Sequence, residues 1–279
     1  MPAGSLGLGF SPKPQIRISL SDNSSYGRGW EVRIHEEETR NMCILTEKDG
    51  QLTADYRHLV PKAGGYDFQP LADPAFAKRA QALLVETVAY LERKKAEEIE
   101  ANRRASDKLT RLAGDEAVMA RWRALVQVLA PNPASAEKIA KATGRAFSAP
   151  QTFIRRLHLS RVTEDVPWLA LIDALRKEKL LVEFDWKEDA DELAAGVDRL
   201  CAQSGHPSLD WATLSPEKAT SAADLLNAAN RALEVNGVML VCLDTASDSF
   251  PTALLAAASF EVASSHAAAF GCKLKRHFA

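Results

Sequence analysis

The C-terminal part of the chain contains the apolar run Val238-Met239-Leu240-Val241-Cys242-Leu243, which follows the turn residues Asn236-Gly237. Six apolar residues in succession, with no polar residue alternating between them, are typical of a strand buried on both faces. A strand of this kind lies inside a sheet that is covered by other elements. The run therefore predicts a C-terminal sheet covered by helices.

Helical and strand patterns alternate around this run. The spacing of apolar residues predicts helices at 166–178, 189–203, 221–234 and 259–270, and strands at 180–186 and 250–255. Because helices alternate with strands, we interpret residues 161–279 as one α/β domain.

The N-terminal part, residues 1–72, has a different pattern. Apolar and polar residues alternate at 16–20 and again at 30–34, with turn residues between them, which predicts a β-hairpin; a third strand is expected at 41–45. The polar stretch 26–40 is interpreted as an edge strand that another chain can extend. Residues 1–72 are therefore expected to be rich in β-structure.

A helical connector is expected at 73–160. Apolar residues recur at helical spacing from Asp73-Pro74, and charged residues continue the helix to about residue 112, with a solvated stretch at 92–108. The predicted fold is thus α+β or α/β, with a β-hairpin-rich N-terminal part, a helical middle and a C-terminal sheet covered by helices.

The composition of the chain indicates the cellular compartment in which the protein is expected. The chain has no apolar run long enough to span a membrane, and its first residues lack the pattern of a secretion signal. The four cysteines have no C-x-x-C spacing, so reduced and mostly buried thiols are expected. We therefore interpret the chain as a cytoplasmic protein that does not contact a membrane.

The net charge of -2 conceals an uneven distribution. Residues 71–160 carry 16 lysines and arginines against 10 acidic residues, whereas 181–250 carry 4 against 13. An acidic region repels nucleic acid and favours basic partners or cations, although a solvated surface explains the same charges. In the basic middle, Arg145, Arg155 and Arg156 lie near a helix-turn-helix-like pattern, so nucleic-acid association through this part is kept as an alternative.

Four ordered segments resemble a bacterial family. They are Pro167-Trp168-Leu169-Ala170-Leu171-Ile172-Asp173-Ala174-Leu175, Phe184-Asp185-Trp186-Lys187-Glu188-Asp189, Leu209-Asp210-Trp211 and Leu243-Asp244-Thr245-Ala246-Ser247-Asp248-Ser249-Phe250-Pro251. Together they are similar to the domain-of-unknown-function family 6630 over residues 160–279. The resemblance implies a bacterial origin and a small α/β domain, and it brings no established activity. Ala246 stands where the family commonly has glycine, which argues against a left-handed backbone there.

Acidic residues gather where the two best-defined strands end. Asp185, Glu188, Asp189, Asp191 and Glu192 lie at a strand end and in the first turn of a helix, where the helix dipole alone favours carboxylates. The functional interpretation is that Asp185 and Glu188 join Asp244 and Asp248 in an acidic mouth at the carboxyl edge of the sheet. Such a mouth can receive an arginine or lysine of a partner, or a divalent cation.

No complete catalytic or metal-binding motif is present. Ser247 and Ser249 have no G-x-S-x-G context, the histidines lack metal-ligand spacing, and phosphate-binding glycine loops are missing from the sequence. Capping of the turn explains the hydroxyls of the 244–249 loop. Trp168, Trp186 and Trp211 are interpreted as core anchors, although an exposed tryptophan is a natural hot spot for a partner.

The leading hypothesis is a non-enzymatic protein-binding module, in the form of an immunity protein that neutralises a basic toxin domain through its acidic surface. No catalytic residue, metal ligand or cofactor is assigned, and the oligomeric state stays open. Two alternatives are a metal-dependent hydrolase using Asp185, Asp244 and Asp248, and a nucleic-acid-associated protein. The partner-binding residues that we expect are Asp185, Trp186, Glu188, Asp189, Glu192, Asp244, Ser247 and Asp248.

Overall fold

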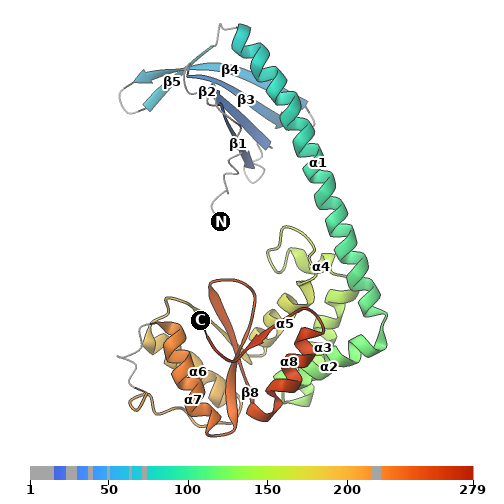
Figure 1. Cartoon of the computed structure of the whole chain (residues 1–279), viewed down its shortest axis with the longest axis vertical. Coiled ribbons are helices and arrows are strands. Elements are labelled where there is room, and N and C mark those ends of the chain that lie inside the picture. Colours follow the sequence, from blue (N-terminus) through green and yellow to red (C-terminus); the bar gives the residue numbers. More distant parts are fainter. Residues whose placement is uncertain are drawn as a thin grey trace. The chain divides into compact units, whose positions relative to one another are not determined.

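The computed structural model describes residues 16–22, 30–36, 40–48, 51–62, 65–70, 74–214 and 221–278 (Figure 1). The chain divides into two compact units, residues 1–97 and 98–279. Both contain a sheet, and the fold is mixed α+β, as the sequence patterns predict.

The first unit contains a five-stranded antiparallel meander. Its strands follow one another in space in chain order and are β1 (Ile16–Asp22), β2 (Trp30–Glu36), β3 (Asn41–Lys48), β4 (Gln51–Lys62) and β5 (Gly65–Pro70). The predicted hairpin and third strand are confirmed. The edge-strand interpretation of residues 26–40 is wrong, because β2 pairs with β1 on one side and with β3 on the other. Residues 26–29 and 37–39 of that stretch lie outside the described residues.

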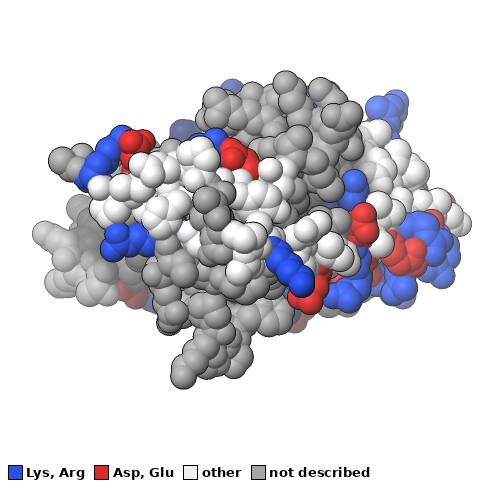
Figure 2. All heavy atoms as spheres, turned by 90° about the horizontal axis from the view of Figure 1, so that it is seen from above, with Lys and Arg blue, Asp and Glu red and all other residues white. Residues whose placement is uncertain are grey.

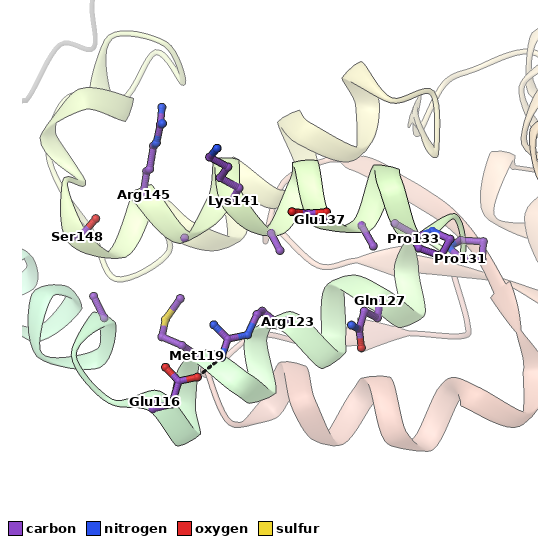
Figure 3. Close-up of a pocket in the computed structure, with 15 residues that line it drawn as sticks. Glu116, Met119, Arg123, Gln127, Pro131, Pro133, Glu137, Lys141, Arg145 and Ser148 are labelled. Atoms are coloured by element: carbon purple, nitrogen blue, oxygen red, sulfur yellow. Dashed lines mark hydrogen bonds and ion pairs between the residues drawn. The ribbon is translucent and has the colours of Figure 1, made fainter.

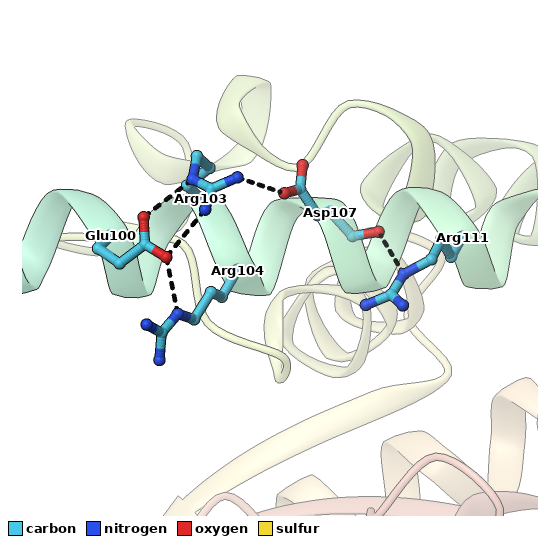
Figure 4. Close-up of polar contacts among 5 residues, drawn as sticks. All are labelled: Glu100, Arg103, Arg104, Asp107 and Arg111. Atoms are coloured by element: carbon cyan, nitrogen blue, oxygen red, sulfur yellow. Dashed lines mark hydrogen bonds and ion pairs between the residues drawn. The ribbon is translucent and has the colours of Figure 1, made fainter.

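Helix α1 (Pro74–Ala113) begins directly after this sheet and ends in the second unit. Its stretch at 92–108 is largely exposed, as expected, and is rich in ion pairs. Glu100 accepts hydrogen bonds from both Arg103 and Arg104, which hold the pKa of its carboxyl at about 2 (Figure 4). In the second unit Leu109 is buried, so this end of the helix is anchored by apolar contact. Figure 2, a view from above Figure 1, shows basic and acidic side chains interspersed on that face of the molecule.

Four further helices follow in the second unit. They are α2 (Glu116–Leu129), α3 (Pro133–Ser148), α4 (Gln151–Ile154) and α5 (Val166–Lys177). Asp115 caps α2 and Asn132 caps α3, each by accepting from two backbone N–H groups of the first turn. Trp122 is fully buried between these helices and donates its indole N–H to Thr143 at 2.9 Å.

The second unit is built around a four-stranded sheet in the order β6-β8-β7-β9, with every neighbouring pair antiparallel. Its strands are β6 (Leu181–Asp185), β7 (Val238–Leu243), β8 (Ser249–Ala256) and β9 (Leu274–Lys275). The elements that complete it are α6 (Ala190–Gln203), α7 (Ala222–Glu234), the 3-10 turn η3 (Ala257–Ser259) and α8 (Phe260–Ala268).

Every residue of β7 is buried, and the strand separates two apolar cores. Met239, Val241 and Leu243 pack with residues of α2, α3, α5 and α8, whereas Val238 and Leu240 pack with residues of α6 and α7. The prediction of a strand buried on both faces is confirmed. Two layers of helices therefore enclose the sheet.

The described residues contain no helix that combines the length and apolar character needed to cross a bilayer. All four cysteines are unpaired, and three of them are buried, namely Cys43, Cys201 and Cys242. Burial raises the pKa of the Cys242 thiol to about 11, which makes it a packing residue at neutral pH.

Candidate functional site

The two acidic segments meet at one end of the second sheet. Asp185 is the last residue of β6, the loop 244–249 leads from β7 to β8, and Asp185 lies opposite Ser249 in the β6–β8 ladder. Because β8 runs antiparallel to both of its neighbours, β6 and β7 are parallel to each other and their carboxyl ends reach the same edge. We refer to residues 185–192 and 244–249 together as the rim.

Most carboxylates of the first rim segment bond nearby backbone. Asp185 accepts from the N–H of Lys187 at 2.8 Å, and Glu188 accepts from the N–H of Asp185 at 2.9 Å. Asp189 caps α6 by accepting from the N–H groups of Asp191 and Glu192 at 3.1 and 2.9 Å. Hydrogen bonds within the turn and capping of α6 thus account for the positions of these three side chains.

The electrostatics of this segment leave negative charge uncompensated. A hydrogen bond with Glu188, together with the charges of Asp189 and Glu188, raises the pKa of Glu192 above its usual value. Neighbouring carboxylates in this segment thus disfavour the ionised form of Glu192. A cation placed here would counter this effect.

Trp186 lies in the middle of this acidic turn with 52% of its surface exposed. The amino group of Lys187 lies 4.5 Å from the centre of the indole ring. The interpretation of Trp186 as a core anchor is therefore wrong, because its side chain is exposed in the turn that follows β6. Trp168 is buried, as predicted, and Trp211 is half-buried, with its indole N–H donating to Asp198 at 3.1 Å.

Asp244, in the second rim segment, is largely compensated within the domain. Lys275 forms an ion pair with it at 3.0 Å, and its carboxylate accepts from the N–H of Ala246 at 3.2 Å. Burial opposes ionisation of Asp244, but these two contacts hold its pKa below the usual value. The indole N–H of Trp168 donates to the backbone carbonyl of Asp244 at 2.9 Å, so the start of the loop is firmly positioned.

Ala246 adopts a left-handed backbone with φ of 53°. The sequence argument against such a turn, based on the missing glycine, is therefore wrong at this position. The hydrogen bond from the N–H of Ala246 to Asp244 stabilises the turn and offsets part of the cost of a left-handed alanine.

A chain of side-chain hydrogen bonds crosses the rim. Thr245 and Ser247 hydroxyls lie 2.7 Å apart, Ser247 and Ser249 hydroxyls lie 3.1 Å apart, and Ser249 donates to Glu183 of β6 at 2.7 Å. Sequence reasoning missed Glu183. The signal was the alternation within β6, where Glu183 and Asp185 are exposed and Phe184 is buried.

Among the described residues, no group of three or more histidine, cysteine, aspartate or glutamate side chains could hold a metal ion, so Asp185, Asp244 and Asp248 do not form such a group. In the basic middle, Arg156 is engaged in an ion pair with Asp173.

A groove of about 1050 Å³ lies between α2 and α3 (Figure 3). Lys141 and Arg145 line it together with Glu137, and across the groove Arg123 is ion-paired with Glu116. Because its walls carry both signs of charge, the groove does not form the continuous basic surface that nucleic acid binding uses.

The second unit is thus an α+β domain in which a four-stranded antiparallel sheet, enclosed by helices, presents an acidic rim with an exposed tryptophan. A family model described as a domain of unknown function (DUF6630) matches residues 121–278. The chain belongs to this family, which confirms the resemblance and extends it toward the N-terminus to include most of α2 and all of α3. Comparison with curated proteins and with solved structures gives no match.

Proposed function

We propose that the second unit is a protein-binding module whose rim binds a basic surface of another protein. The observation that carries the proposal is the exposure of Trp186 between Asp185 and Glu188. Tryptophan is among the residues that contribute most to protein interfaces.

The chemistry of the rim suits an arginine or a lysine. The indole face already holds the amino group of Lys187 at 4.5 Å, so a cation of a partner can occupy the same kind of position. Glu192, whose pKa is raised by a hydrogen bond with Glu188 and by the charges of Asp189 and Glu188, lies among carboxylates that offer acceptors to the same cation. An arginine would stack on the ring and bond a carboxylate at the same time.

A basic toxin domain is the narrower partner class that we propose. Proteins that act on polyanions carry cationic active sites, and an acidic rim with an aromatic anchor can cover such a site and suppress its activity. This form of the proposal rests on charge complementarity alone and adds the expectation that binding inhibits the partner.

The test is affinity capture from the native host with three versions of the full chain. Wild type and Val235→Ala are expected to retain the same basic protein, because Val235 is an exposed apolar residue outside the rim. Trp186→Ala is expected to lose that protein, and raising the salt concentration should release it from the wild type. Retention of the same proteins by Trp186→Ala would refute the proposal.

A further inference from the structure

The hydrogen bonds of β7 establish which way the backbone groups of the sheet point. The side-chain amide of Asn230 bonds both the N–H and the C=O of Leu240, at 2.8 and 3.1 Å. The backbone groups of Leu240 therefore point away from β8. Because successive residues of a strand point their backbone groups to opposite sides, those of Val241 point toward β8, where Val241 pairs with Ala253.

The same alternation applies to β8 and then to β6. Since the backbone of Ala253 faces β7, that of Thr252 faces β6, where it pairs with Val182. Glu183, the next residue of β6, lies opposite Pro251 in a pair whose backbone groups point away from each other. The N–H and C=O of Glu183 consequently point to the free edge of β6.

Asp185, two residues further along, gives an independent check. Its N–H bonds the side chain of Glu188 and its C=O accepts from the N–H of Glu188, so both groups lie on the side away from β8. Leu181, Glu183 and Asp185 therefore face the same edge. Glu188 closes that edge at Asp185, whereas Leu181 and Glu183 bond no further group through their backbone among the described residues.

The two edges of the sheet thus differ. Beyond β7, the backbone of Leu240 is occupied by Asn230, which also bonds the carbonyl of Arg276, and β9 pairs with the end of the strand. Beyond β6, the backbone N–H and C=O groups of Leu181 and Glu183 have no hydrogen-bond partner among the described residues. An open row of this kind is the template for addition of a strand from another chain.

The charges on β6 indicate which kind of strand can pair with it. Glu183 and Asp185 project exposed carboxylates from the same side of the strand, and although Ser249 and the N–H of Lys187 already bond them, their negative charges favour an added strand with lysine or arginine at the facing positions. A second copy of β6 is disfavoured, because an antiparallel pair centred on Glu183 places two glutamates opposite each other. Arg176 lies 3.5 Å from Glu183, but exposed pairs of this kind contribute little, so it does not block the position.

We infer that β6 accepts an extended basic segment of the partner protein as a fifth strand of the second sheet, with cationic side chains facing Glu183 and Asp185. The inference rests on the proposed function and adds the mode of recognition. The segment runs along β6 toward Trp186, so strand pairing and the aromatic anchor belong to one continuous surface.

The position of the Glu183 N–H allows a sharp test. Glu183→Pro removes a backbone donor that β8 does not use, whereas Glu183→Ala removes the carboxylate and keeps the donor. The probe is an eight-residue peptide of alternating lysine and valine, measured by calorimetric titration of the full chain. Both variants are expected to stay folded, and Glu183→Pro to bind the peptide about tenfold more weakly than Glu183→Ala, because it loses a hydrogen bond and the fit of the strand.

Hydrogen exchange provides the second measurement. The amides of Leu181 and Glu183 should become protected when the lysine–valine peptide is added to the wild type, and a glutamate–valine peptide should leave them unchanged. Equal peptide affinity of the proline and alanine variants, or unaltered exchange at both amides, would overturn the inference. The proposed function is refuted by a different result, namely that Trp186→Ala captures the same host protein as the wild type.

Discussion

The side-chain amide of Asn230 takes the place of a neighbouring strand for Leu240, with its oxygen 2.8 Å from the N–H and its nitrogen 3.1 Å from the C=O. Asn230 is 3% exposed, and the same amide group also donates to the carbonyl of Arg276. An α7 side chain thus completes the edge of β7 where β9 is too short to do so.

Asn230→Ala is therefore expected to lower the free energy of unfolding by about 2 kcal/mol, because it leaves buried backbone groups of Leu240 without partners. The measurement is urea denaturation followed by circular dichroism. Asn236→Ala, at an exposed asparagine in the turn before β7, is the control and should change stability little. An unchanged unfolding midpoint in Asn230→Ala would contradict this account of the sheet edge.

Gly196 of α6 lies against β6, and a Cβ atom at this position would overlap the ring of Phe184. Gly196→Ala is expected to destabilise the domain by about 1–3 kcal/mol through overpacking. The matched control is Gly144→Ala in α3, where the nearest atom to a new Cβ is Met119 Cε at 3.7 Å. That control should be neutral or stabilise the protein by up to about 1 kcal/mol. The two variants are compared by thermal denaturation, and opposite ranking would refute the packing described for α6.

Asp173 gives the protein a predictable response to acid. Burial opposes its ionisation, but hydrogen bonds from Lys177 and Arg156 hold its pKa below the usual value of 3.8. Because the folded pKa is the lower one, the stabilisation is fully present above about pH 4 and is lost as the pH falls through the folded pKa. The stability difference between wild type and Asp173→Asn should accordingly shrink below pH 3.8. It is followed by urea unfolding from pH 6 to pH 2, and a difference that grows on acidification would contradict the assignment.

The rim can be probed without a partner through Glu192. A hydrogen bond with Glu188, together with the charges of Asp189 and Glu188, raises its pKa above the usual 4.5. Glu188→Gln should bring the pKa of Glu192 back toward that value, and Glu98→Gln, in the exposed stretch of α1, should leave it unchanged. Carbon-detected NMR titration of the side-chain carboxyl provides the measurement. A pKa of Glu192 at or below 4.5 in the wild type would show that the rim carries no excess negative charge.

The features that sequence could predict are those carried by a local pattern. The unbroken apolar run of β7 predicts burial on both faces, and Asp185 and Asp244 were placed at one edge because each follows a strand. Features that depend on tertiary neighbours could not be predicted in this way. Trp186 is exposed because it lies in the turn after β6 rather than in the strand, and the orientation of the Glu183 backbone follows from the pairing of β6 with β8.

Two corrections have the same origin. β2 was expected at an edge because its sequence is polar, yet polarity does not reveal that strands pair on both of its sides. Ala246 was expected to avoid a left-handed turn, yet the acceptor on Asp244 makes that turn accessible. In both cases a hydrogen-bonding partner overrides the preference of the residue itself.

Binding of a basic protein at the rim is tested most directly by site-specific photo-crosslinking in the native host. A photoreactive amino acid replaces Lys187, next to Trp186, and in a parallel strain it replaces Val235. The account predicts that position 187 forms a crosslink to one basic protein, that position 235 does not, and that Trp186→Ala abolishes the product. Crosslinks to that protein from position 235 but not from 187, or a product that persists in Trp186→Ala, would contradict it.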